Sequence, residues 1–128
     1  MSCLELDDTA ILKVADPMMD DIIRGLARRD YSLHSCHFSV SLKSLGGPES
    51  FLDECDQYES AWGSPGGREL VAIFRKEKSF TLVWDQQFSA TNGQVMAVMT
   101  VALKGGRYFV DYLLLPVSYT HLTLPTKA

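Results

Sequence analysis

The sequence predicts a single α+β domain whose N-terminal helices pack on a curved, four-stranded antiparallel sheet. Apolar residues recur at helical spacing through the first half of the 128-residue chain, and strand-like runs separated by hairpin-type turns fill most of the second half. Helices that precede a meander of strands are typical of α+β domains, in which the helices cover one face of the sheet. The four strand-like runs are residues 70–74, 80–84, 95–103 and 108–115.

The first helix is expected over residues 17–29. Asp16 can accept hydrogen bonds from the free amides at the start of the helix, and Pro17 suits the first helical position because it has no N–H. Arg28 and Arg29 fall in the last turn, where the helix dipole favours cations. One face is apolar, formed by Met18, Met19, Ile22, Ile23 and Leu26.

Two further helices are indicated. Asp30 can cap a short helix that carries Tyr31 and Phe38, and residues 39–47 then form a connector. Pro48 starts the next helix, which Gly63 ends. The apolar residues of that helix recur at i, i+3 or i+4 and are Phe51, Leu52, Cys55, Tyr58 and Trp62.

The predicted strands are joined by turns, and the third strand has two apolar faces. The turns are the charged residues 76–79, the pair Asn92-Gly93 and the pair Gly105-Gly106. A sheet that is apolar on both sides needs cover on both sides. We therefore expect helices on one face and a second subunit on the other, and we take Val101 and Leu103 as positions that report this association.

The chain divides into three parts in this interpretation. Residues 1–15 form a lead-in, residues 16–115 form the domain, and residues 116–128 form a non-native or disordered tail. Residues 118–126 have no periodic relation to the sheet and resemble the translated adapter sequence that contaminates some assembled sequencing data. His121 in this tail therefore carries no functional weight.

Composition narrows the class of protein. The formal net charge of −4 argues against general nucleic-acid binding, which needs a concentrated basic surface. No apolar stretch approaches the ~20 residues that span a bilayer, and the acidic N-terminus does not resemble a signal peptide. The three cysteines include no CxxC pair, so no disulfide framework is expected. These features predict a cytoplasmic protein that binds neither nucleic acid nor membrane.

Several short motifs add a family resemblance. Asp30-Tyr31 follows the first helix, Phe38-Ser39 comes close behind, and a helix ending in Gly precedes four strands, one of which reads Phe-Thr-Leu-Val-Trp-Asp-Gln-Gln-Phe over residues 80–88. In this order, residues 14–115 resemble small cystatin-like, nuclear transport factor 2-like domains of uncharacterised type. The resemblance implies a cone with an internal pocket. Some members of that superfamily bind small ligands, some only dimerise, and a minority are isomerases or dehydratases, whose catalytic motifs do not occur here.

Potential metal ligands gather between residues 34 and 37. His34, Cys36 and His37 form the densest group, and Cys55 on another helix is a further candidate ligand. Zinc sites need three or four converging ligands, usually in paired spacings, and no second pair occurs. We therefore expect no metal and no cofactor.

Two strand carboxylates, Asp85 and Asp111, are candidates for a general base. A carboxylate desolvated in a pocket has a raised pKa that suits this role. The simpler interpretation is that Asp85 is solvated or lies beside a subunit interface, and that Asp111 is paired with Arg107 or Lys104.

A set of aromatic and methionine residues can either line a ligand cavity or fill the core. Close packing is the usual fate of such residues, so the core is the simpler interpretation. In an enzyme, Tyr31 or Tyr58 would serve as the hydrogen-bond donor. The residues expected to contact a ligand are Tyr31, Phe38, Tyr58, Trp62, Trp84, Met99 and Tyr112.

Together these observations favour a non-catalytic module that binds a small apolar ligand or another protein and forms a homodimer through its sheet face. Two alternatives remain open. One is an isomerase- or dehydratase-type enzyme with a pocket carboxylate as general base. The other is a purely structural dimerisation domain with a filled interior.

Overall fold

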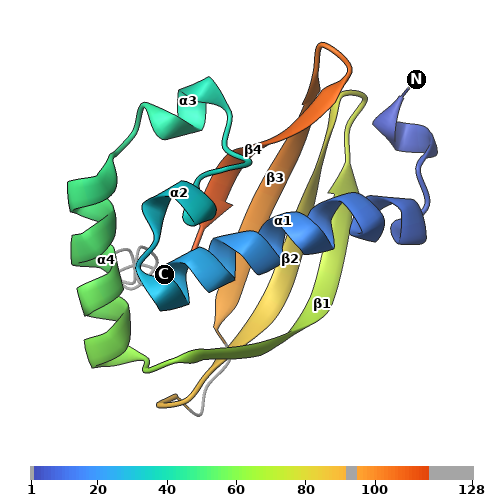
Figure 1. The fold of residues 1–128 in the computed structure, drawn as a ribbon. Helices are drawn as coiled ribbons and strands as arrows, with labels where there is room; N and C mark the ends of the chain where they lie inside the picture. Colours follow the sequence, from blue (N-terminus) through green and yellow to red (C-terminus); the bar gives the residue numbers. More distant parts are fainter. Residues whose placement is uncertain (1, 92–94, 116–128) are drawn as a thin grey trace, which may run out of the picture.

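The computed structural model describes residues 2–91 and 95–115 and confirms the predicted α+β class, with an open four-stranded antiparallel sheet (Figure 1). The helical elements are the 3-10 helix η1 (Cys3–Glu5), α1 (Asp8–Arg28), α2 (Tyr31–His34), α3 (Val40–Lys43) and α4 (Pro48–Ala61). The strands, hydrogen-bonded in chain order, are β1 (Pro65–Arg75), β2 (Ser79–Phe88), β3 (Met96–Lys104) and β4 (Arg107–Leu114). Each predicted strand falls on one of them.

Helix α1 begins at Asp8 rather than at Pro17, which lies inside the helix. The side chain of Asp7 accepts a hydrogen bond from the amide of Ala10 at 2.8 Å and caps the helix. An internal proline costs a helix about 3 kcal/mol. Burial of Ile11 and Ala15, which continue the apolar face ahead of the proline, offsets that cost.

Residues 2–15 therefore belong to the domain, and the expectation of a separate lead-in does not hold for them. Cys3, Ile11 and Ala15 are fully buried in the same core cluster as the sheet residues. The amide of Cys3 also donates a hydrogen bond to the carbonyl of Glu77, in the turn between β1 and β2, at 2.8 Å.

Helix α2 begins at its predicted cap, but the segment after it differs from the expectation in two ways. The carboxylate of Asp30 caps α2 by accepting from the amide of Leu33 at 3.2 Å. Phe38, expected on this helix, lies beyond it and forms a parallel β-bridge with Val110. The expected connector, residues 39–47, contains the four-residue helix α3, whereas α4 starts at Pro48 as predicted.

The core lies between α1 and the inner face of the sheet, which α1 crosses (Figure 1). Because side chains alternate along a strand, every second residue of β2 and β3 points to the helices. The alternate residues of these two strands that are buried in the core are Phe80, Leu82, Trp84, Phe88, Ala97, Met99 and Val101.

A polar residue, Gln86, is also fully buried on this inner face. The register of β1 against β2 shifts between Pro65 and Arg68, which takes carbonyls of β1 out of the regular ladder. The side-chain Nε2 of Gln86 donates to the carbonyls of Gly66 and Gly67 at 3.0 and 3.3 Å. Gln86 therefore supplies the hydrogen bonds that the irregular part of β1 needs.

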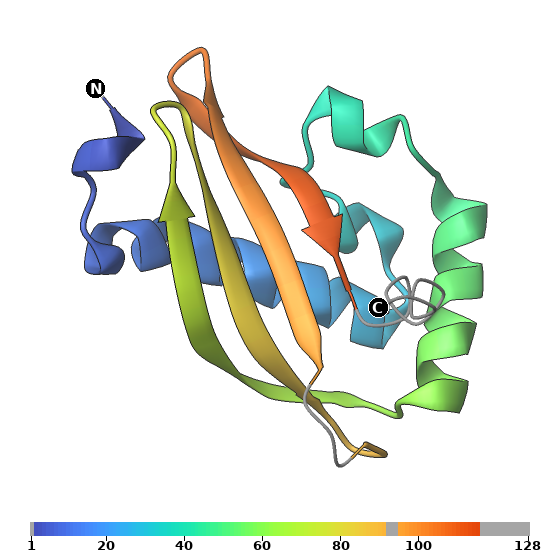
Figure 2. The ribbon, with the colours of Figure 1, turned by 180° about the vertical axis from the view of Figure 1, so that it is seen from behind.

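The opposite face of the sheet has no helix over it among the described residues (Figure 2). Phe74, Thr81, Thr100 and Tyr112 are cross-strand neighbours in one row of this face, and the hydroxyls of the two threonines lie 2.7 Å apart. Phe74 and Tyr112 are 63% and 49% exposed. We call this surface the outer face.

Val101 and Leu103 are not part of the outer face. Val101 is fully buried beneath the helices, and Leu103 packs against the same core. Their choice as reporters of sheet association is therefore wrong, and residues of the outer face take their place.

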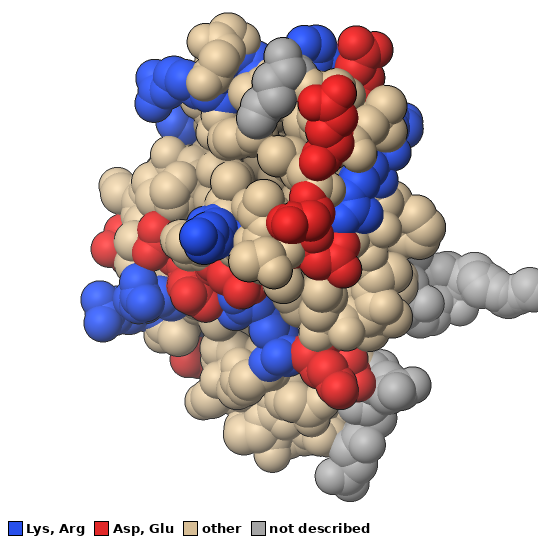
Figure 3. Space-filling view, turned by 90° about the vertical axis from the view of Figure 1, so that its right-hand side faces the viewer, with Lys and Arg blue, Asp and Glu red and all other residues tan. Residues whose placement is uncertain are grey.

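Helix α1 is also held to β1 by charged groups. The guanidinium of Arg68 lies 3.2 Å from the carboxylate of Asp16 and 3.0 Å from that of Asp20. It also stacks over the ring of Trp84 at 5.3 Å from the ring centre. Seen from the β1 side of the molecule, acidic and basic side chains are intermixed, with no concentrated basic surface on that side (Figure 3).

Helices α1 and α2 meet at Gly25. A Cβ atom on this residue would lie 2.4 Å from the backbone nitrogen of His34 and 2.6 Å from its Cα. Only glycine allows two backbones to come this close. The contact fixes α2 directly against the C-terminal part of α1.

We expect Gly25→Ala to lower the free energy of unfolding by about 1–3 kcal/mol, the usual cost of overpacking. In an unobstructed helix the same change would raise it by about 1 kcal/mol. Urea denaturation followed by circular dichroism measures the difference. Gly67→Ala is the control, because no atom lies within 4 Å of its added Cβ. A Gly25→Ala protein as stable as the wild type would contradict the close contact.

Candidate functional site

A pocket of about 310 Å³ opens between α2, α3, α4 and the end of β4. The order of the chain explains its position: the segment after α2 bridges to β4 at Val110, and α4 then packs back alongside α2. The residues that line the pocket are mostly apolar or aromatic. They are Tyr31, His34, Phe38, Leu42, Leu45, Gly46, Gly47, Ser50, Phe51, Glu54, Leu113 and Leu115.

His34 is the most distinctive polar group of this pocket. Its side chain is buried, and its ring lies 4.5 Å from that of Phe51 and 5.4 Å from that of Phe38. Nδ1 lies 2.9 Å from the carbonyl of Ile22 on α1. A carbonyl can only accept, so Nδ1 carries the proton in this hydrogen bond and Nε2 of the neutral ring has a free lone pair.

Burial keeps His34 in this neutral form. Desolvation lowers the pKa of the imidazole, and the hydrogen bond to Ile22 opposes the shift only in part. Within the described residues Nε2 has no hydrogen-bond partner. The pocket therefore offers a ligand one imidazole acceptor beside aromatic rings.

A carboxylate, Glu54 of α4, also lines the pocket. Its side chain reaches solvent at the rim, but partial desolvation raises its pKa above the ordinary value for glutamate. The helical pattern of α4 places Glu54 one turn after Phe51. The sequence analysis did not select it, because a glutamate on an amphipathic helix is usually solvated.

Only two of the seven residues expected to contact a ligand line this pocket, Tyr31 and Phe38. Tyr58 stacks on Phe88 at 5.7 Å, and Trp62 lies 6.1 Å from the same ring. The other three lie elsewhere: Trp84 and Met99 are buried beneath α1, and Tyr112 is on the outer face.

The two strand carboxylates do not lie in the pocket. Asp85 lies on the outer face, opposite Glu69 and Met96 in the neighbouring strands. Asp111 accepts from the hydroxyl of Ser39 at 2.7 Å and pairs with Lys104 at 3.0 Å, one of the two partners that the sequence suggested. These two hydrogen bonds lower the pKa of Asp111, which makes it a weaker base.

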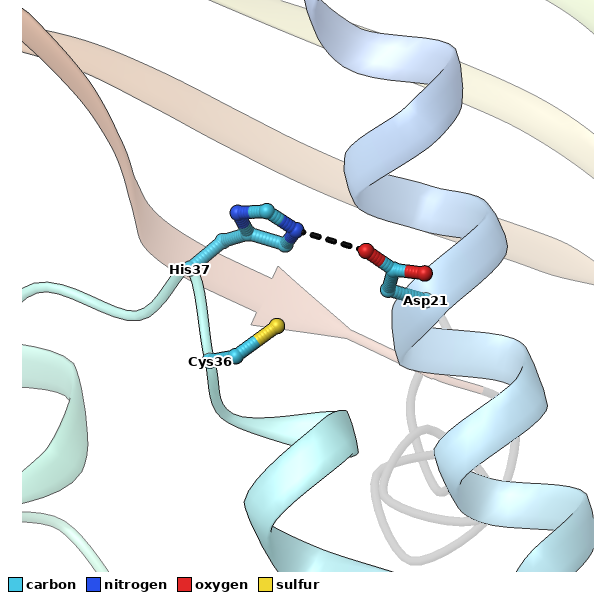
Figure 4. A group of neighbouring side chains, drawn as sticks. All are labelled: Asp21, Cys36 and His37. Carbon is cyan, nitrogen blue, oxygen red and sulfur yellow. Dashed lines mark hydrogen bonds and ion pairs between the residues drawn. The ribbon is translucent and has the colours of Figure 1, made fainter.

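The residues expected as the densest group of metal ligands separate in the structure. His34 turns into the pocket, and Cys55 is buried with its thiol 3.7 Å from the carbonyl of Leu26. Cys36 and His37 instead lie beside Asp21 of α1, with all three ligand atoms within 4.8 Å of one another (Figure 4). Helical and loop spacing alone do not reveal this group, because Asp21 comes from a distant element.

Comparison with known proteins gives no family for this chain. No protein-family model matches the sequence, and no curated protein matches it significantly. Among the described residues, no helix is both long and apolar enough to cross a lipid bilayer.

Proposed function

We propose that the protein binds a small, largely apolar molecule in the α2–α4 pocket and presents Nε2 of His34 to a hydrogen-bond donor on that ligand. The observation that carries this proposal is a buried, neutral imidazole with a free acceptor in an aromatic pocket of about 310 Å³. Small-molecule sites are typically apolar hollows of this size with a few convergent polar groups. The proposal is based on the geometry of this pocket and not on similarity to proteins of known function.

Phenol and toluene test this proposal, because they differ in a single hydrogen-bond donor. We expect phenol to bind the full chain about fivefold more tightly than toluene. One net hydrogen bond contributes about 1 kcal/mol, which corresponds to that ratio. Ligand titrations followed by NMR shifts of residues around the pocket measure both dissociation constants.

His34→Asn is the matched variant. The shorter amide can still donate to the carbonyl of Ile22 but lacks an acceptor in the place of Nε2. We expect the preference for phenol to disappear while toluene binding changes little. Equal binding of the two compounds by the wild type, or a preference that survives in the variant, would refute the assigned role of His34.

A second candidate function is an isomerase- or dehydratase-type enzyme. The observation that favours it is Glu54, a pocket carboxylate whose pKa is raised by desolvation. Asp111 is less suited to act as a base because its pKa is lowered, and Asp85 lies away from the pocket. Glu54 would remove a proton, and Tyr31 would donate a hydrogen bond to the developing oxyanion.

The enzyme hypothesis predicts that the protein isomerises a small cyclic β,γ-unsaturated ketone to the conjugated α,β-unsaturated ketone. Glu54 would move the proton from the α to the γ carbon, and the increase in ultraviolet absorbance of the conjugated product measures the rate. Glu54→Gln should lower this rate by at least about a hundredfold, the usual contribution of a general base. Glu49→Gln, an exposed position on the same helix outside this pocket, should leave it unchanged. If the wild-type protein were no faster than buffer, the enzyme hypothesis would be refuted and only the binding function would remain.

We also propose that two copies associate through the outer face. Exposed apolar side chains on an uncovered sheet mark an interaction surface, and a second copy offers the same surface in return. The resemblance to cystatin-like, nuclear transport factor 2-like domains supports both parts of the proposal, since some of those domains bind small ligands and others dimerise. A purely structural dimerisation domain would instead leave the pocket without a ligand.

The double substitution Phe74→Lys and Tyr112→Lys should convert a dimer into a monomer, because it places two cations per copy in the apolar contact. Both positions are already exposed, so the free energy of unfolding should change by less than about 1 kcal/mol in total. Light scattering after gel filtration gives the mass. Val40→Lys, at an 86% exposed position on α3, is the control and should remain dimeric. A monomeric wild type would rule out the association.

A further inference from the structure

We propose that Asp21, Cys36 and His37 form a three-ligand site for a divalent cation of the zinc class. They supply a carboxylate oxygen, a thiol sulfur and an imidazole nitrogen from α1 and from the segment that follows α2. None of the three lines the α2–α4 pocket, so this site is independent of the function proposed above.

The geometry of the group suits a four-coordinate ion. Nε2 of His37 and Oδ2 of Asp21 lie 2.8 Å apart, and one imidazole nitrogen, one carboxylate oxygen and Sγ of Cys36 all lie within 4.8 Å of one another. Around tetrahedral zinc, bonds of about 2.0–2.3 Å place neighbouring ligand atoms roughly 3.3–3.8 Å apart. Small side-chain movements therefore bring all three atoms to one ion. Figure 4 shows the thiol directed to the space beside the histidine–aspartate pair.

The side chain of Asp21 and the backbone of His37 are held in place before any ion arrives. Nη1 of Arg24 donates to Oδ1 of Asp21 at 2.9 Å, which leaves Oδ2 directed at His37. The carbonyl of His37 accepts from the amide of Val110 in β4 at 2.7 Å. A side-chain partner such as Arg24 orients a metal ligand, and its loss commonly changes affinity by about 10–100-fold, whereas the hydrogen bond to Val110 fixes only the main chain of His37.

Charge and access also fit a dication. The side chains of His37 and Asp21 are 31% and 28% exposed, and Cys36 is exposed, so an ion can reach all three. On binding, the thiol releases its proton and Nε2 of His37 gives up the proton that it donates to Asp21, so the ligating ring carries its one proton on Nδ1, which Figure 4 shows on the far side of the ring from Asp21. The carboxylate and thiolate then balance the two charges of the ion, although Arg24 and Lys43 lie nearby and weaken its attraction.

The ligand set selects the class of ion. Thiolate and imidazole favour zinc and its neighbours in the first transition row, whereas magnesium and calcium favour oxygen alone. Three protein ligands leave a fourth position for water or an external ligand, the arrangement of zinc sites that carry out chemistry rather than purely structural ones.

Cobalt(II) tests the site because it reports thiolate ligation directly. We expect CoCl₂ added to the reduced full chain to give a sulfur-to-cobalt charge-transfer band and strong visible bands of four-coordinate cobalt. ZnCl₂ should abolish both, since such sites bind zinc more tightly than cobalt. Absence of the charge-transfer band would overturn the proposal.

Substitutions then assign the ligands. Cys36→Ser should remove the charge-transfer band, and Asp21→Asn and His37→Gln should each weaken cobalt binding by more than about tenfold. Cys55→Ser and His121→Ala are the controls and should leave the spectrum unchanged, with folding of each variant checked by circular dichroism. A band that survives Cys36→Ser, or an affinity unaffected by both Asp21→Asn and His37→Gln, would refute the site.

Discussion

The close approach of α1 and α2 at Gly25 is the constraint on which the rest of the structure depends. Because the backbone of His34 occupies the space where a side chain of α1 would lie, α2 is pressed against the helix that covers the sheet. This contact brings Nδ1 of His34 to the carbonyl of Ile22 and places Cys36 and His37 beside Asp21. The chain then continues to β4, where Phe38 pairs with Val110. A single glycine thus positions both the pocket histidine and the three-ligand group.

Local patterns predicted most of the fold because they reflect local physics. Alternation in residues 80–84 identified β2 and its two faces, and Pro48 and Gly63 set the limits of α4. The start of α1 was mispredicted because a proline usually marks the beginning of a helix. Here the burial of Ile11 and Ala15 against the sheet outweighs the lost hydrogen bond at Pro17, a tertiary effect that no window of sequence contains.

The sites were harder to predict than the fold, since they depend on which segments meet. Tyr31 and Phe38 were selected as aromatic residues and do line the pocket, but the same criterion selected Trp84 and Met99, which are packed beneath α1. Aromatic spacing does not distinguish a core from a cavity wall. His34 was considered only as a metal ligand, although burial and the carbonyl of Ile22 give it a different chemistry.

The bridge between Phe38 and Val110 has a consequence for how native molecules can meet. The amide of Val110 donates a hydrogen bond to the carbonyl of His37, and its carbonyl accepts one from the amide of Ser39. The free edge of β4 is therefore blocked at this residue. A fibre that grows by strand addition needs two free sheet edges on each molecule, one for each of its neighbours. At Val110 a strand of a second molecule would find no free donor or acceptor, so strand addition along this edge is interrupted in the middle of β4.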